Sequence, residues 1–202
     1  MSKAGLAVLQ HRPYLQIMRL IQALKFLVPA LIIGTAPPLA WSQTKPAPAT
    51  ATDDTAPKLL AKFGDWRTAT HLEAGMVVCY AYTTVTASSP PLAGRGQVTL
   101  TVTQRPQGPR DAVAVTPGFA YAANATVGTT VDGAAVDFYT AQRSAFARDG
   151  KVAVQSFLKG KQVIVRSPSP KGGQVADSFS LKGFGAAYAA INKSCPPGAT
   201  TR

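Results

Sequence analysis

DSFSLKGFGAAYAAINKSCP, residues 177–196, decides how the C-terminal part of the chain is expected to fold. Four of its large or apolar residues recur at the i, i+3, i+4 and i+7 spacing of one helix face. They are Phe184, Ala187, Tyr188 and Ile191. Ser180 is a suitable N-cap residue, and Pro196 cannot continue a helix. The stretch therefore predicts a helix over residues 181–195 that ends in Cys195.

The first 42 residues have the pattern of an export signal. The basic stretch MRLIQALK (18–25) precedes the apolar run FLVPALIIGTA (26–36), and small residues then favour cleavage before Gln43. Met18 would give a more compact signal than Met1. The apolar run is shorter than the roughly 20 residues of a membrane-spanning helix, although an uncleaved anchor is the alternative.

The chain has two cysteines, Cys79 and Cys195. An even number of cysteines in an oxidising compartment favours a disulfide, which here would join an early strand to the C-terminal helix. Two buried free thiols are the alternative. A redox-active pair is less favoured, because the chain contains no C-x-x-C motif.

The region between signal and domain, residues 43–57, is rich in Pro, Ala and Thr and has no apolar periodicity. We interpret it as a disordered tether, followed by one domain over residues 58–198 and a disordered tail over residues 199–202.

Most of the domain predicts strands, because β-branched and aromatic residues alternate with polar ones. In 75–86 the even positions Met76, Val78, Tyr80 and Tyr82 share a face, and in 97–105 the threonines lie opposite the apolar residues. Further strands are expected at 111–118, 161–167 and 175–181, a hairpin at 125–140 that turns at Asp132-Gly133, and a short helix at 149–161. We expect a mainly β fold, an antiparallel sandwich or barrel-like sheet with a C-terminal helix.

No catalytic, cofactor-binding or metal site is expected from local spacing. His71 is the single histidine after residue 42, and the acidic residues are scattered. The FGDW stretch places Phe63 and Trp66 around a Gly-Asp turn. These aromatics are either a hydrophobic plug at the start of the first strand or exposed anchors for a partner.

Without residues 1–42 the chain has 17 basic and 9 acidic residues, and so a net charge of +8. Such a surface favours contact with anionic membranes or polyanions, but a basic surface that is simply solvated is the interpretation we prefer to a specific anion site. Nucleic acid is not expected as a partner, because the chain is exported and has no motif of stacking aromatics.

Three stretches together resemble the invasion-associated locus B family of Gram-negative bacteria: FGDW (63–66), VCYAY (78–82) and DSFSLKGFGAAYAAINKSCP. The resemblance covers roughly residues 62–196. It implies an exported, β-rich periplasmic or envelope protein, with cysteines at the positions of Cys79 and Cys195 and no agreed catalytic residues.

We therefore expect a non-enzymatic periplasmic or envelope protein that acts through contacts with another envelope protein. An accessory subunit of a periplasmic or membrane-bound enzyme complex is one version. The alternatives are an enzyme or small-ligand binder whose site is built from residues distant in sequence, and adhesion to a host surface.

Overall fold

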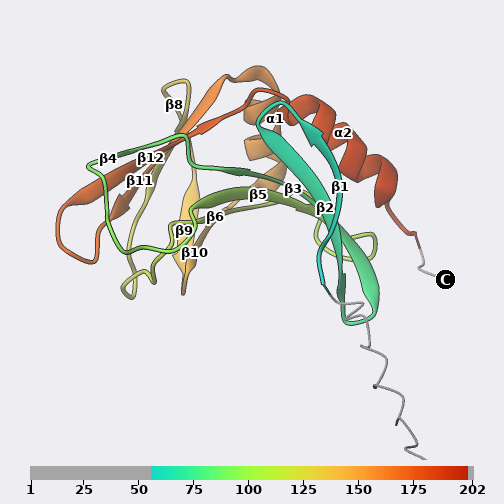
Figure 1. Ribbon diagram of the computed structural model, residues 1–202, viewed down its shortest axis with the longest axis horizontal. Helices are drawn as coiled ribbons and strands as arrows, with labels where there is room; N and C mark the ends of the chain where they lie inside the picture. Colours follow the sequence, from blue (N-terminus) through green and yellow to red (C-terminus); the bar gives the residue numbers. More distant parts are fainter. Residues whose placement is uncertain (1–55, 200–202) are drawn as a thin grey trace, which may run out of the picture. The chain divides into compact units, whose positions relative to one another are not determined.

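The computed structural model describes residues 56–199 (Figure 1). The signal predicted for residues 1–42, most of the tether and most of the tail lie outside these residues. The described part folds into two antiparallel sheets and two helices, which confirms the mainly β prediction. Both sheets contribute side chains to one buried core, in a sandwich-like arrangement that is not closed into a barrel.

The seven-stranded sheet has the order β1 (Lys58–Phe63), β2 (Trp66–Glu73), β3 (Met76–Thr84), β5 (Thr99–Gln104), β6 (Ala112–Thr116), β10 (Ser144–Ala147) and β9 (Phe138–Ala141). The five-stranded sheet has the order β4 (Ala87–Ser89), β12 (Gln174–Ser180), β11 (Gln162–Pro168), β7 (Gly128–Val131) and β8 (Ala134–Val136). The helices are α1 (Gly150–Lys159) and α2 (Phe184–Ser194).

The core lies between the inner faces of the two sheets and under both helices. In the seven-stranded sheet, one set of alternating residues is buried, including Cys79 and Ala81 of β3, Leu100 and Val102 of β5, and Val113 of β6. The side chains of α1 and α2 belong to the same buried cluster. Figure 1 shows the two helices on one side of this sheet.

Both predicted helices are confirmed, but α2 begins later than expected. Asp149 caps α1, because its carboxylate accepts a hydrogen bond from the backbone N–H of Val152 at 2.9 Å. The expectation that Ser180 caps α2 is wrong. Its hydroxyl accepts from the backbone N–H of Lys182 at 3.2 Å, and Gly183 with φ +91° is the cap residue instead.

The predicted hairpin at 125–140 is shorter in the structure. β7 and β8 pair across Asp132-Gly133, whose positive φ angles of 48° and 91° suit a tight turn. After Val136 the chain leaves the five-stranded sheet and continues as β9 in the other one. The short strands β1, β4 and β10 have no counterpart among the predicted strands.

The turn between β1 and β2 packs directly against the start of α2. The backbone N–H of Asp65 donates to the carbonyl of Lys182 at 3.0 Å. A Cβ atom on Gly64 would lie 2.6 Å from that carbonyl oxygen, and one on Gly183 would lie 2.1 Å from the carbonyl oxygen of Phe63. We call this contact the turn–helix junction. Only glycine allows two backbones to approach this closely.

Trp66 extends the junction into the core. Its indole N–H donates to the carbonyl of Ser180 at 3.0 Å, and its ring lies 4.8 Å from that of Phe184, centre to centre. The FGDW stretch and the DSFSLKGF stretch, more than a hundred residues apart, therefore form one packed unit. The plug interpretation of FGDW fits this arrangement.

The other end of α2 is held by the predicted disulfide, which is confirmed. Cys79 of β3 and Cys195 are bonded, with a Cα–Cα distance of 5.9 Å and a sequence separation of 116 residues. Next to it, Arg110 donates to the carbonyl of Cys195 at 2.6 Å, and the Tyr188 hydroxyl donates to Asp111 at 2.7 Å. A disulfide across so long a loop stabilises the fold by on the order of 4–5 kcal/mol in the chain-entropy description.

A buried ion pair connects the five-stranded sheet to the loop after β4. Asp177 occupies an inward position of β12 and is 1% exposed. Both of its oxygens accept from Arg95, at 2.6 and 2.8 Å, and one also accepts from the Ser88 hydroxyl at 2.6 Å. The hydrogen bond to Asp177 raises the pKa of Arg95, so the guanidinium stays charged. The guanidinium compensates the negative charge of a carboxylate that would otherwise be buried without a partner.

Gly183→Ala tests the turn–helix junction, with Gly133→Ala as the matched control. Both glycines have φ +91°, but a Cβ atom at Gly133 would meet nothing within 4 Å. The control should lose roughly 1–2 kcal/mol of unfolding free energy from the left-handed backbone. Gly183→Ala should lose about 1–3 kcal/mol more because of the added clash. Equal losses in urea denaturation would show that the close approach is unimportant.

Arg95→Ala tests the buried ion pair. Removing the guanidinium leaves the Asp177 carboxylate without its charged partner, so the unfolding free energy should fall by about 3–5 kcal/mol. Arg143→Ala, at an exposed position, should change it by less than about 0.5 kcal/mol. The double variant R95A/D177N should recover part of the loss. A loss for R95A as small as that of R143A in urea denaturation would contradict this account.

Candidate functional site

The two aromatics predicted as partner contacts have different environments. Trp66 is 0% exposed, so its side chain is a core residue and offers no surface to a partner in this structure. Phe63 is partly buried and packs against the core. A contact role for Phe63 stays a prediction.

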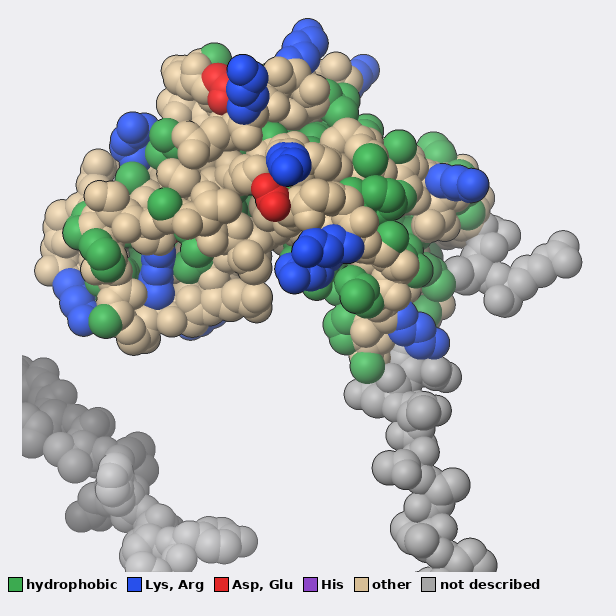
Figure 2. All heavy atoms as spheres, turned by 45° about the horizontal axis from the view of Figure 1, so that its top comes forward, with side chains coloured by type: hydrophobic (Ala, Val, Ile, Leu, Met, Phe, Trp, Pro, Cys, Tyr) green, Lys and Arg blue, Asp and Glu red, His purple; other side chains and the backbone are tan. Residues whose placement is uncertain are grey.

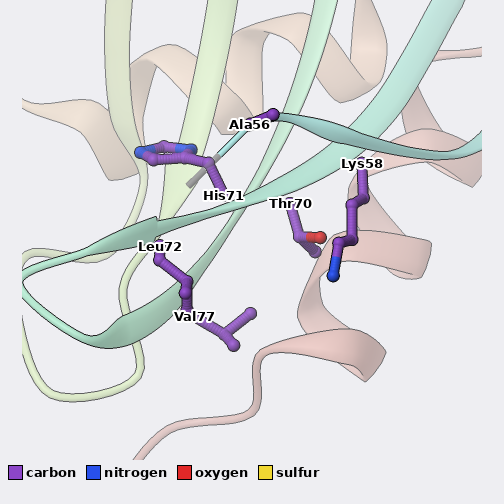
Figure 3. A pocket seen from close by; sticks show the side chains of 6 residues that line it. All are labelled: Ala56, Lys58, Thr70, His71, Leu72 and Val77. Atoms are coloured by element: carbon purple, nitrogen blue, oxygen red, sulfur yellow. The ribbon is translucent and has the colours of Figure 1, made fainter. Parts of the chain in front are cut away.

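His71 lines a hollow of about 230 Å³ beside β1 and β2 (Figure 3). Figure 3 shows the imidazole on one side of β2, while the side chains of Thr70 and Leu72 point to the other side. This follows from the alternation of a strand. The imidazole packs edge-on against Tyr80, with ring centres 5.4 Å apart. His71, Thr70 and Lys58 therefore do not converge on one point of this hollow.

No group of three or more His, Cys, Asp or Glu side chains within residues 56–199 could hold a metal ion. No helix in this range is both long and apolar enough to cross a membrane.

The face of the seven-stranded sheet that points away from the core, which we call the outer face, has a continuous line of side chains across all seven strands. Directly opposite residues of neighbouring strands share a face, so the pairing register defines this line. From one edge of the sheet to the other it contains Lys62, Arg67, Tyr82, Thr101, Ala114, Phe146 and Tyr139. Lys62 and Tyr139 are exposed and the other five are half-buried. We call this line the cross-strand row.

Aromatic rings form two groups on the outer face. Tyr80 and Tyr82 of β3 lie next to each other, with ring centres 5.7 Å apart. Tyr139 and Phe146, on β9 and β10, are also 5.7 Å apart, and the guanidinium of Arg148 lies 5.4 Å from the centre of the Tyr139 ring. Rings that are half-exposed in this way supply large, rigid contact area for a partner.

Between the two aromatic groups, β5 and β6 present only small side chains to the outer face. These are Thr99, Thr101, Thr103, Ala112, Ala114 and Thr116. All six are half-buried, and none carries a charge. The outer face thus has two aromatic groups separated by small residues.

Two charged pairs lie at the margins of the outer face. Arg105 donates to Glu73 at 2.6 Å, and Arg148 lies 3.1 Å from Asp137. The hydrogen bond from Arg105 lowers the pKa of Glu73, so this carboxylate stays ionised and paired. Burial raises the pKa of Tyr80, so its phenol is neutral at pH 7.

Basic side chains are also present elsewhere on the molecule. In Figure 2, Lys and Arg side chains are spread over the visible face, whereas Asp and Glu side chains are few. Positive charge alone therefore does not mark a site. The outer face adds partly exposed aromatic rings to this charge.

The sequence pattern placed some of these residues on a common side of their own strand. It did not show that these sides combine into one face of the sheet. Alternation placed Tyr80 and Tyr82 together on one side of β3, and the threonines together on one side of β5. The register then pairs Tyr82 with Thr101 and Tyr80 with Thr103, which puts both sets on the outer face. Register depends on the pairing of whole strands, so the sequence pattern of each strand alone could not show it.

Comparison with known proteins identifies the family to which the chain belongs. The sequence profile of the invasion associated locus B (IalB) protein family matches residues 66–192. Among solved structures, the crystal structure of invasion associated protein B from Bartonella henselae is similar with a TM-score of 0.49 and 16% identity, and covers 66% of this chain and 95% of that chain. No curated protein sequence matches the chain. The profile match spans more than half of the chain and includes Trp66, VCYAY and most of the C-terminal stretch, and on this basis the chain belongs to the invasion associated locus B family.

Proposed function

We propose that this chain is an exported, non-enzymatic protein of the periplasm or outer envelope that acts by binding another envelope protein through the outer face. Export is supported by the basic and apolar pattern of residues 1–42 and by the family. The disulfide between Cys79 and Cys195 suits an oxidising compartment.

The observation that carries the proposal is the composition of the outer face. Tyr and Arg are among the residue types that dominate binding energy at protein interfaces, Phe is enriched there, and the cross-strand row contains all three. Both helices and the five-stranded sheet pack against the opposite, inner face. The outer face can therefore be covered by a partner without any rearrangement of the core.

An accessory subunit of a larger envelope complex is the form of this function that we favour. A subunit that docks by a preformed sheet face needs no active site of its own, and the residues that would carry its role are contact residues. Tyr82 and Phe146, which lie on either side of the small residues of β5 and β6, are the central candidates.

A pull-down from the native envelope tests this proposal. The tagged chain is exported in its own cells, recovered in gentle detergent, and its stoichiometric partners are quantified. The double variant Y82A/F146A should reduce partner recovery by at least about fivefold, because it removes both aromatic contacts. The control V152A/L158A removes two exposed apolar side chains of α1 and should reduce recovery by less than about twofold.

Thermal unfolding of both variants checks that each is folded. A stoichiometric partner whose recovery is unchanged in Y82A/F146A but lost in V152A/L158A would move the interface to the helices. A chain that purifies without any stoichiometric partner would contradict the proposed function.

A further inference from the structure

The charge of the outer face is concentrated at its β1–β2 end. Lys62 and Arg67 are directly opposite each other in the strand pairing. Within residues 56–199 neither forms an ion pair, although the exposed Asp65 lies in the turn that joins their strands, and Glu73 at the far end of β2 pairs with Arg105. Two adjacent cations without acidic partners form a site that attracts carboxylates or other anions.

The opposite end of the cross-strand row is aromatic. Phe146 and Tyr139 face each other across β10 and β9. Next to them, the guanidinium of Arg148 lies 3.1 Å from the carboxylate of Asp137 and above the ring of Tyr139. A partner is therefore expected to place acidic groups at one end of the row and apolar groups at the other.

The length of the row indicates the size of what it can hold. Seven strands at about 4.8 Å spacing make a row of roughly 29 Å. An extended protein segment advances about 3.3 Å per residue, so about nine residues would span it. In the middle, Thr101 and Ala114 are small enough to let a backbone lie close to the sheet.

We propose that the outer face binds an acidic, extended segment of another protein, with carboxylates at Lys62 and Arg67 and apolar side chains over Tyr82 and Phe146. This inference rests on the proposed function and adds the chemistry of the partner. Phe146 and Tyr139 present aromatic rings at the β9–β10 end of the row, so that end calls for apolar atoms on the partner. An acidic polysaccharide offers mainly hydroxyl groups there.

A membrane surface fits this face less well than a protein segment does. The apolar side chains of the cross-strand row are mostly half-buried, whereas insertion between lipids needs apolar side chains that protrude. The more exposed apolar residues lie outside the cross-strand row: Val152 and Leu158 on α1, Leu59 and Leu60 on the edge strand β1, and Met76 at the start of β3.

The test uses residues 43–202 with the disulfide formed and four defined probes. These are a random copolymer of glutamate and tyrosine, polyglutamate, alginate as an acidic polysaccharide, and phosphatidylglycerol vesicles. We expect the copolymer to bind most tightly. The charge reversal K62E/R67E should weaken its binding at least about tenfold, and the matched reversal K151E/K159E on α1 less than about twofold.

The aromatic contacts have a separate readout in the same assay. Y82A/F146A should weaken binding of the copolymer and leave the weaker binding of polyglutamate nearly unchanged, because polyglutamate lacks the rings. Equal effects of the two charge reversals would overturn the proposal in favour of a general attraction between charges. Tighter binding of alginate or of the vesicles than of the copolymer would overturn it in favour of those partners.

Failure of this inference is distinguishable from failure of the proposed function. The copolymer could fail to bind while partner recovery from the envelope still depends on Tyr82 and Phe146. In that case the proposed acidic chemistry of the partner is wrong, and the outer face remains the interface. If partner recovery is also independent of these residues, both proposals fail.

Discussion

The close approach of Gly64 and Gly183 is the contact on which the rest of this structure depends. It seats the start of α2 against the first hairpin, and the Cys79–Cys195 disulfide fixes the other end of the same helix to β3. Held at both ends, α2 covers the inner face of the seven-stranded sheet together with α1. The inner face of this sheet packs into the core, which leaves its outer face open to solvent.

Charge is divided between the interior and the surface in a way that supports the same conclusion. The ion pair of Arg95 and Asp177 is buried, where losing one partner costs about 3–5 kcal/mol, so it serves the fold. The exposed pair of Arg105 and Glu73 is worth only about 0–1 kcal/mol, because water screens it. Lys62 and Arg67 form no ion pair within residues 56–199, and so they are available for the contact that we propose.

The sequence predicted the elements better than their assembly. Alternation and helical spacing located most strands and both helices, and the cysteine count led to the correct disulfide. The alternation Val175-Asp177-Phe179 also contained a signal that went unused, since an acid on an apolar strand face must find a buried partner. Its partner Arg95 lies 82 residues away, and only the tertiary structure brings the two together. For the same reason the cross-strand row, which depends on register through seven strands, could not be read from any local pattern.

Photo-crosslinking in living cells tests most directly whether the outer face is the working surface. A photoreactive phenylalanine analogue is placed at Tyr82 on the outer face or at Val152 on α1, and crosslinked products are identified after illumination. Our account predicts that Tyr82 crosslinks to an envelope protein and that Val152 does not. Crosslinks from Val152 with none from Tyr82 would contradict it, because the partner would then lie on the helix layer rather than on the open sheet.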